Sequence, residues 1–166
     1  YLKQALEIKG NKAYDKMQKG RISFLLGDTA QAISFMEEAI AGKETDAYFY
    51  MAEIQEAIGD SQAAQENIKN YIESGKLDSY HLFNVANSQL ARGRYDMAIE
   101  CLNQALELEN VPNKQMIMRT LVIAHEQNRD FEAAKKLMAE YVEKYPDDEE
   151  AKRELTFLET RIPTEE

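Results

Sequence analysis

Apolar side chains recur along this chain with the period of an α-helix, and a short break precedes each recurrence. Between residues 93 and 108, the apolar positions on one helical face are Met97, Ala98, Cys101, Leu102, Ala105 and Leu106. This spacing is that of an amphipathic helix with about 3.6 residues per turn. The same pattern follows breaks at Gly27, Gly59 and Arg129. We therefore predict amphipathic helices at regular intervals along the chain.

The four segments that share this pattern are in register with one another. The fifth residue after each break is an alanine, and the four alanines are Ala32, Ala64, Ala98 and Ala134. Their separations are 32, 34 and 36 residues, a period typical of solenoids and other repeat arrays. A second helical segment precedes each break, so we expect each repeat to contain two helices.

The predicted repeats occupy residues 13–44, 45–78, 79–112 and 113–146, with a half repeat at 1–12 and a capping helix at 147–162. Together these make about ten helices in one domain. A two-helix unit cannot cover its own apolar face, so each unit is expected to stack on the next.

Further positions resemble the tetratricopeptide repeat, a unit of about 34 residues made of two antiparallel helices. Seven positions before the breaks stand the residues Gly20, Ala52, Ala86 and Val122. Aromatic residues follow two of the breaks, at Tyr95 and Phe131, and Pro146 matches the proline that ends a repeat. The resemblance implies an all-α fold, a right-handed α-α superhelix (solenoid) of antiparallel helix pairs, and it is shared with many bacterial proteins.

Some positions depart from this family pattern. Thr29 and Ser61 replace the aromatic residue after the break, and Lys16 and Lys19 replace large apolar residues in the first full repeat. Tyrosines stand at two positions, Tyr71 and Tyr141, where the other repeats have Ala39 and Ala105. We expect less typical packing of the first repeat and altered helix spacing at the two tyrosines.

Composition narrows the choice of partners. The 166 residues carry a net charge of −10, which argues against nucleic acid because its binding requires Lys and Arg to neutralise phosphates. No apolar run approaches the roughly 18–20 residues of a membrane span, so we expect no membrane insertion by this segment. Residues 1–27 carry six basic and two acidic side chains, whereas residues 130–166 carry six basic and twelve acidic ones. Weak self-association between unlike ends therefore stays open.

The first residue, Tyr1, falls inside a predicted helix, which indicates a fragment of a longer protein. Its location is left unknown, because both a cytoplasmic and an exported, lipid-anchored protein fit the sequence.

The sequence offers no group of side chains suited to catalysis. Its two histidines, His81 and His125, lie 44 residues apart without a ligand-spaced neighbour, and its one cysteine, Cys101, falls on the apolar face. The acidic run at 147–150 follows Pro146 and opens a predicted helix. Negative charge at the start of a helix is stabilised by the helix dipole. We predict no catalytic residue, no metal site and no cofactor, and hence no enzyme.

A second stripe on the first helix of each pair is the candidate binding surface. In the third repeat, Leu82, Val85, Ala86 and Gln89 form the packing face, and at about 100° per residue another stripe lies a third of a turn away. The resemblance implies that this outer stripe lines a concave groove. By repeat, the outer stripe consists of Tyr14, Met17, Arg21 and Phe24; Asp46, Phe49, Glu53 and Glu56; Tyr80, Phe83, Asn87 and Leu90; and Met116, Arg119, Ile123 and Glu126.

We therefore predict a protein-interaction module that binds a peptide or a partner helix in this groove. Its predicted site residues are Tyr14, Met17, Arg21, Phe49, Glu53, Tyr80, Phe83, Asn84, Asn87 and Arg119. Three alternatives stay open: the rings pack against neighbouring helices, the chain is a structural or oligomerising scaffold, or it is an accessory part of a larger enzyme. Some repeats of this family bind the carboxylate of a chaperone tail with a set of amide and basic side chains, the carboxylate clamp. We reject such a clamp here, because Arg21 and Glu53 stand where it needs amide and basic groups.

Overall fold

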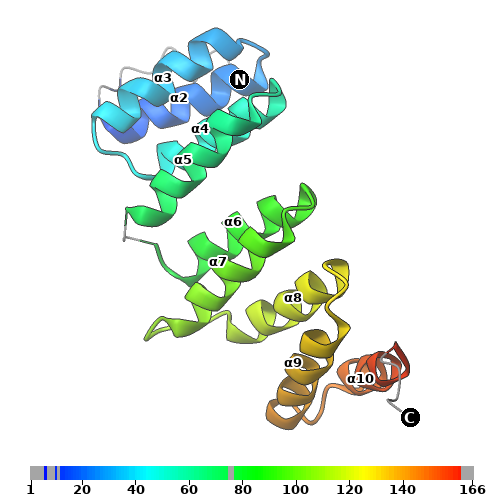
Figure 1. The fold of residues 1–166 in the computed structure, drawn as a ribbon. Coiled ribbons are helices and arrows are strands. Elements are labelled where there is room, and N and C mark those ends of the chain that lie inside the picture. Colours follow the sequence, from blue (N-terminus) through cyan, green and yellow to red (C-terminus); the bar gives the residue numbers. More distant parts are fainter. Residues whose placement is uncertain (1–5, 7–9, 11, 75–76, 162–166) are drawn as a thin grey trace. The chain divides into compact units, whose positions relative to one another are not determined.

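The structure is a computed structural model that describes residues 6, 10, 12–74 and 77–161. In these ranges all regular secondary structure is helical, and all but the last of the helices labelled in Figure 1 form antiparallel pairs. The chain divides into two compact units, residues 1–76 and 77–166. The prediction of a single domain stays a prediction, and the two units are described separately.

The first unit contains two helix pairs, α2 (Ala13–Leu25) with α3 (Thr29–Ala41) and α4 (Asp46–Ala57) with α5 (Ser61–Glu73). The apolar faces of α2, α3 and α4 meet in one core. Its buried members are Met17, Ala32, Met36, Ala39, Ala47, Met51 and Ile54. The core thus joins neighbouring pairs as well as the helices within a pair, as nearest-neighbour stacking requires.

The second unit contains two helix pairs and a final helix. The pairs are α6 (Ser79–Ala91) with α7 (Tyr95–Glu107) and α8 (Lys114–Gln127) with α9 (Phe131–Lys144); α10 (Glu149–Arg161) follows. The apolar faces of α8, α9 and α10 share a core that includes Val122, Ala134, Met138 and Leu158. The last helix therefore covers the apolar face of the pair before it.

The predicted all-α fold is confirmed, and each predicted helix from residue 13 onward is present with ends shifted by a few residues at most. The four repeat alanines, Ala32, Ala64, Ala98 and Ala134, are completely buried. The predicted half repeat at 1–12 lies almost entirely outside the described residues. No helix in the described ranges is long and apolar enough to span a membrane.

Each break is a turn in the left-handed backbone region. The φ angles are 83° at Gly27, 85° at Gly59, 71° at Gly93 and 62° at Arg129. The next amide closes each turn on the helix before it: Asp28 N–H donates to the Ser23 carbonyl at 2.9 Å, and Asp130 N–H to the His125 carbonyl at 2.9 Å. Such a turn satisfies carbonyls left open at a helix end, and glycine adopts it without the strain that a side chain adds. Arg129 carries that strain.

Two departures from the family pattern have visible consequences. Lys16 forms an ion pair with Glu38 and lies 5.5 Å from the ring centre of Phe35. Tyr71 and Tyr141 are buried to 3% and 1% exposure, and both hydroxyl groups reach a carboxylate at the start of a helix. The Tyr71 hydroxyl thus links the two helices of one pair, whereas the Tyr141 hydroxyl links α9 to the start of α10, and alanine can form neither hydrogen bond.

Candidate functional site

The outer stripe begins with an exposed apolar side chain in three of the four helices that carry it. Tyr14 is 56% exposed, Tyr80 is 50% exposed and Met116 is 53% exposed, whereas the second repeat has Asp46 at this position. A large apolar side chain held in water at equivalent positions of a repeat is more informative than a scattered one. This position marks a surface that is available for contact.

Helix α6 separates its two faces as the sequence predicts. The packing face of Leu82, Val85, Ala86 and Gln89 is buried throughout. On the other side, Tyr80, Asn84 and Asn87 are exposed, and Phe83 is half-buried. Asparagine amides can both donate and accept hydrogen bonds. This side of α6 therefore presents rings together with groups able to bind a peptide backbone.

Met17 does not belong to this surface. Its side chain is 2% exposed and packs in the first unit's core with Met36. It lies one turn before Gly20, where helix α3 approaches so closely that an added Cβ would stand 2.9 Å from the Met36 methyl carbon. The close approach of α3 buries this side of α2, so a position that is half-buried at Phe49, Phe83 and Arg119 in the other repeats belongs to the core in this one.

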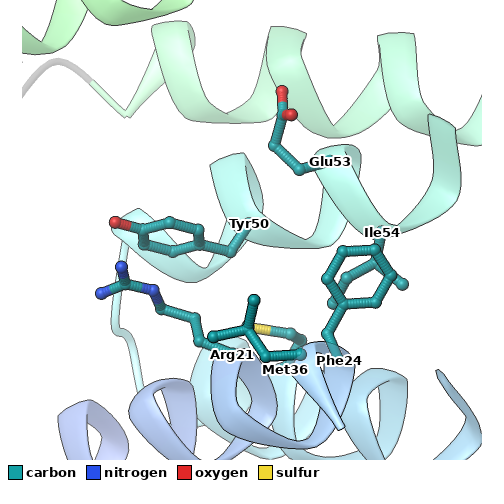
Figure 2. A pocket seen from close by; sticks show the side chains of 7 residues that line it. Arg21, Phe24, Met36, Tyr50, Glu53 and Ile54 are labelled. Carbon is teal, nitrogen blue, oxygen red and sulfur yellow. The ribbon is translucent and has the colours of Figure 1, made fainter. Parts of the chain in front are cut away.

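Three stripe residues of the first unit, Arg21, Phe24 and Glu53, border a cavity of about 200 Å³. Helices α2, α3 and α4 contribute its lining, which consists of Arg21, Phe24, Leu25, Met36, Tyr50, Glu53 and Ile54. Figure 2 shows apolar side chains on one side and the Arg21–Tyr50 pair on the other. The Arg21 guanidinium carbon is 4.2 Å from the centre of the Tyr50 ring, an attractive cation–π geometry.

Phe49 instead packs among aromatic rings. Its ring centre lies 5.6 Å from that of Tyr50 and 5.7 Å from that of Tyr71, whose hydroxyl donates to Asp46 at 2.9 Å. The ring is half-buried. Phe49 thus supports the helices around it as well as bordering the surface.

Arg119 of the second unit pairs with carboxylates at the start of the final helix and within it. Its guanidinium lies 3.1 Å from the Glu154 carboxylate and 4.0 Å from that of Asp148, and 5.5 Å from the Tyr141 ring centre. The Tyr141 hydroxyl accepts from Gln115 at 2.8 Å and donates to Asp148 at 2.8 Å. These contacts make Arg119 part of the attachment of α10.

A second, more polar cavity of about 470 Å³ lies beside these contacts. It is lined by Tyr80, Pro112, Asn113, Gln115, Met116, Arg119, Thr120 and Tyr141. Two predicted site residues, Tyr80 and Arg119, are thereby brought to one hollow, together with the exposed Met116.

Two carboxyl groups near Arg119 have shifted pKa values, with opposite directions. Burial raises the pKa of Glu126, and the nearby Glu154 carboxylate adds to this, although Arg119 and Arg161 oppose it. The pKa of Asp148 is lowered, first by the hydrogen bond from the Ala151 amide and then by that from Tyr141. Asp148 is therefore held ionised at the start of α10, where a negative charge is favoured.

The cysteine and the two histidines, the candidates for chemistry in the sequence, are held by packing or by a neighbouring carboxylate. Burial raises the pKa of the Cys101 thiol to about 12, so the reactive thiolate is suppressed. The ring of His81 contacts Asp78 at 2.7 Å and that of His125 contacts Asp130 at 3.2 Å, each beside a helix start. Among the described residues, no three His, Cys, Asp or Glu side chains are grouped to bind a metal ion.

Several residues that shape these surfaces lie outside the predicted stripe. Tyr50 directly follows Phe49 and is rotated by about 100° around the helix, so a single stripe omits it. Leu25 is 71% exposed, and Leu25 and Leu26 are adjacent apolar residues at a helix end, which is the signal that would have identified them. Gln115 and Tyr141 act across helices and carry no such signal.

Comparisons with known proteins agree with this geometry. Three family profiles, each described as tetratricopeptide repeat, match residues 16–41, 51–115 and 89–155. No curated protein matches the sequence.

Solved structures share the fold at low sequence identity. MamA (residues 41 to the end) from Desulfovibrio magneticus RS-1 is 16% identical, with 92% of this chain and 86% of that one covered and a TM-score of 0.60. YrrB, described as a TPR protein with an unusual peptide-binding site, is 13% identical, with coverages of 95% and 81% and a TM-score of 0.60. The C-terminal part of a repeat protein from Cytophaga hutchinsonii is 12% identical, covers 90% and 59%, and has a TM-score of 0.62.

Such similarities establish the architecture, and this architecture supports a protein–protein interaction module. Together, the matched profiles extend over most of the helices described above. The chain belongs to the tetratricopeptide repeat family.

Proposed function

We propose that the outer stripe binds a peptide or a partner helix without covalent chemistry. The observation that carries this proposal is the repeated exposure of Tyr14, Tyr80 and Met116, each at least half exposed at the same position of its repeat. Apolar side chains of this size contribute strongly to binding when a partner removes them from water. The helices keep these side chains in place because their opposite faces are buried.

Polar groups beside the apolar ones complete the proposed surface. Asn84 and Asn87 lie exposed on α6, close in sequence to Phe83, and their amides offer both donors and acceptors to an extended backbone. The proposed function of this surface is recognition of a partner.

Selection from a library of random twelve-residue peptides, displayed by fusion through their C-terminal ends, tests this proposal. Peptides selected on the unaltered protein are synthesised and their affinities measured for Tyr14→Ser, Tyr80→Ser and Met116→Ser. We expect at least one of the three substitutions to weaken each peptide by about tenfold or more, the effect of removing a good contact residue.

Ile58→Ser and Phe157→Ser provide matched controls, because these side chains are 52% and 48% exposed but lie off the outer stripe. All five variants should keep their helical content. If no peptide is enriched, or if the controls weaken binding as much as the stripe substitutions do, the outer stripe is not a binding surface.

A further inference from the structure

The cavity of the first unit has an apolar interior that is open at one side. Met36 and Ile54 are 0% and 1% exposed and form its inner wall, and half-buried Phe24 stands beside them (Figure 2). Leu25, at 71% exposure, is the apolar part of the lining that remains in water. An incoming apolar side chain would therefore cover the exposed Leu25 and contact Phe24, above the buried Met36 and Ile54.

The cavity has the size of one large side chain. Its volume is about 200 Å³, and an engineered apolar cavity of about 150 Å³ in another protein accepts benzene. Leucine, methionine and phenylalanine side chains match this space. Met36 lies in the wall, and a methionine side chain adapts its shape readily to an incoming group.

The edge of the cavity carries one positive charge in a defined position. Arg21 donates to the Gln18 side chain at 3.1 Å and stacks over Tyr50, and within the described part of the chain it forms no ion pair. Figure 2 shows Glu53 pointing away from the guanidinium. The stacked guanidinium keeps other N–H groups available, and arginine pairs with carboxylates through two parallel hydrogen bonds.

We propose that this cavity receives a large apolar side chain of a bound peptide while Arg21 pairs with an adjacent Asp or Glu side chain of the same peptide. This inference rests on the proposed function, since it names what the first unit recognises. The charge on α2 favours such a partner, because this helix carries Lys19 and Arg21, besides Lys16 in its ion pair with Glu38, against a single acidic residue, Asp15. The proposed occupant is thus an acidic segment with Leu, Met or Phe next to the acid.

The peptides selected above provide the test, because fusion through the C-terminus leaves side chains as their source of carboxylates. We expect one class of peptides with Leu, Met or Phe beside Asp or Glu. Arg21→Gln should weaken this class about tenfold, and replacing the peptide's acid by its amide should cost as much on the unaltered protein but little on Arg21→Gln. Leu25→Gln should weaken the same peptides several-fold.

Controls separate the pocket from general charge and exposure. Lys69→Gln removes the same charge from an exposed position of this unit, and Ile58→Gln removes an apolar side chain that does not line the cavity. Neither should change the affinity by more than about twofold. The Met36 methyl resonance should shift on binding to the unaltered protein.

Two results overturn this inference. Peptides that lack the acid–apolar pair and depend on Tyr80 or Met116 would leave the proposed function standing and remove the role of this cavity. Equal losses for Arg21→Gln and Lys69→Gln would show attraction by net charge without a specific pair. A library without enriched peptides would contradict the proposed function itself.

Discussion

The two units each place an arginine against a tyrosine ring beside a cavity, but the two arginines have different partners. Arg21 lies over Tyr50 and is exposed, with a neutral glutamine as its hydrogen-bond partner. Arg119 is closer to buried, with its side chain 24% exposed, and it pairs with Glu154 of α10. The spacing of residues along a helix predicts which charged side chains lie at its surface. Whether such a side chain forms an ion pair within the protein depends on the neighbouring helix.

This difference assigns separate roles to the two positions. The carboxylates of Asp148 and Glu154 come from the segment that begins and forms α10, so Arg119 contributes to the packing of the second unit. The first unit leaves the Arg21 guanidinium facing water. Stability should therefore depend on Arg119, and recognition on Arg21.

The largest expected effect is on the stability of the second unit. Arg119→Ala removes the ion pair to Glu154 and the contact with Tyr141, and we expect the free energy of unfolding to fall by about 2 kcal/mol. Arg21→Ala, at an exposed site, should cost less than about 1 kcal/mol. Urea unfolding followed by circular dichroism measures both.

Arg153→Ala is the control for this pair of variants, since Arg153 is exposed on α10. A loss for Arg21→Ala as large as that for Arg119→Ala would mean that both arginines are structural, and it would end the distinction between the units.

The two buried tyrosines offer a smaller effect of the same kind. Tyr141→Phe removes the hydrogen bonds to Gln115 and Asp148, and we expect a loss of about 1–2 kcal/mol. Tyr71→Phe removes the hydrogen bond to Asp46 in the first unit and should cost about 1 kcal/mol. Thermal melting of both variants gives the comparison, and an unchanged melting temperature for Tyr141→Phe would show that its two hydrogen bonds add nothing to stability.

The smallest expected effect is a pH dependence confined to the second unit. The pKa of Glu126 is raised in the folded state by burial and by Glu154, so the folded protein binds this proton more tightly than the unfolded chain. Stability from this group is present below the unfolded value of 4.5 and is lost as the pH rises through the folded pKa. Glu126→Gln should therefore raise the melting temperature more at pH 7 than at pH 4.

Glu159→Gln, at an exposed position on α10, controls for the loss of a negative charge. The Glu126 effect should grow in the Arg119→Ala background, because Arg119 opposes the rise of this pKa. The same gain at both pH values would exclude the titration of Glu126 as its cause.

The helices could be predicted because their signals are local and repeated. A helical apolar period, a left-handed break and a buried alanine recur in register, and the complete burial of Ala98 and its equivalents follows from that register. The packing face of α6 was predicted for the same reason. The exposure of Tyr80 and Asn87 on the other side of α6 could likewise be predicted from this helix alone.

The site was predicted less well where contacts with another helix determine whether a side chain is exposed or paired. An ideal helical wheel puts Met17 at the edge of the surface, but the close approach of α3 at Gly20 moves that edge into the core. The partners of Arg119 lie on α10, and no spacing within α8 indicates them. Whether the outer stripe binds a peptide stays a prediction.

Every break turn is complete within its own repeat, since its closing hydrogen bond joins residues five positions apart, as from Asp60 N–H to the Gln55 carbonyl at 2.9 Å. A duplication or deletion of one repeat in evolution would leave all such turns intact. The bond from Tyr141 to Asp148 is different, because it joins α9 to the element that follows. Recombination could therefore exchange turns freely, whereas the last pair and α10 would have to be inherited together.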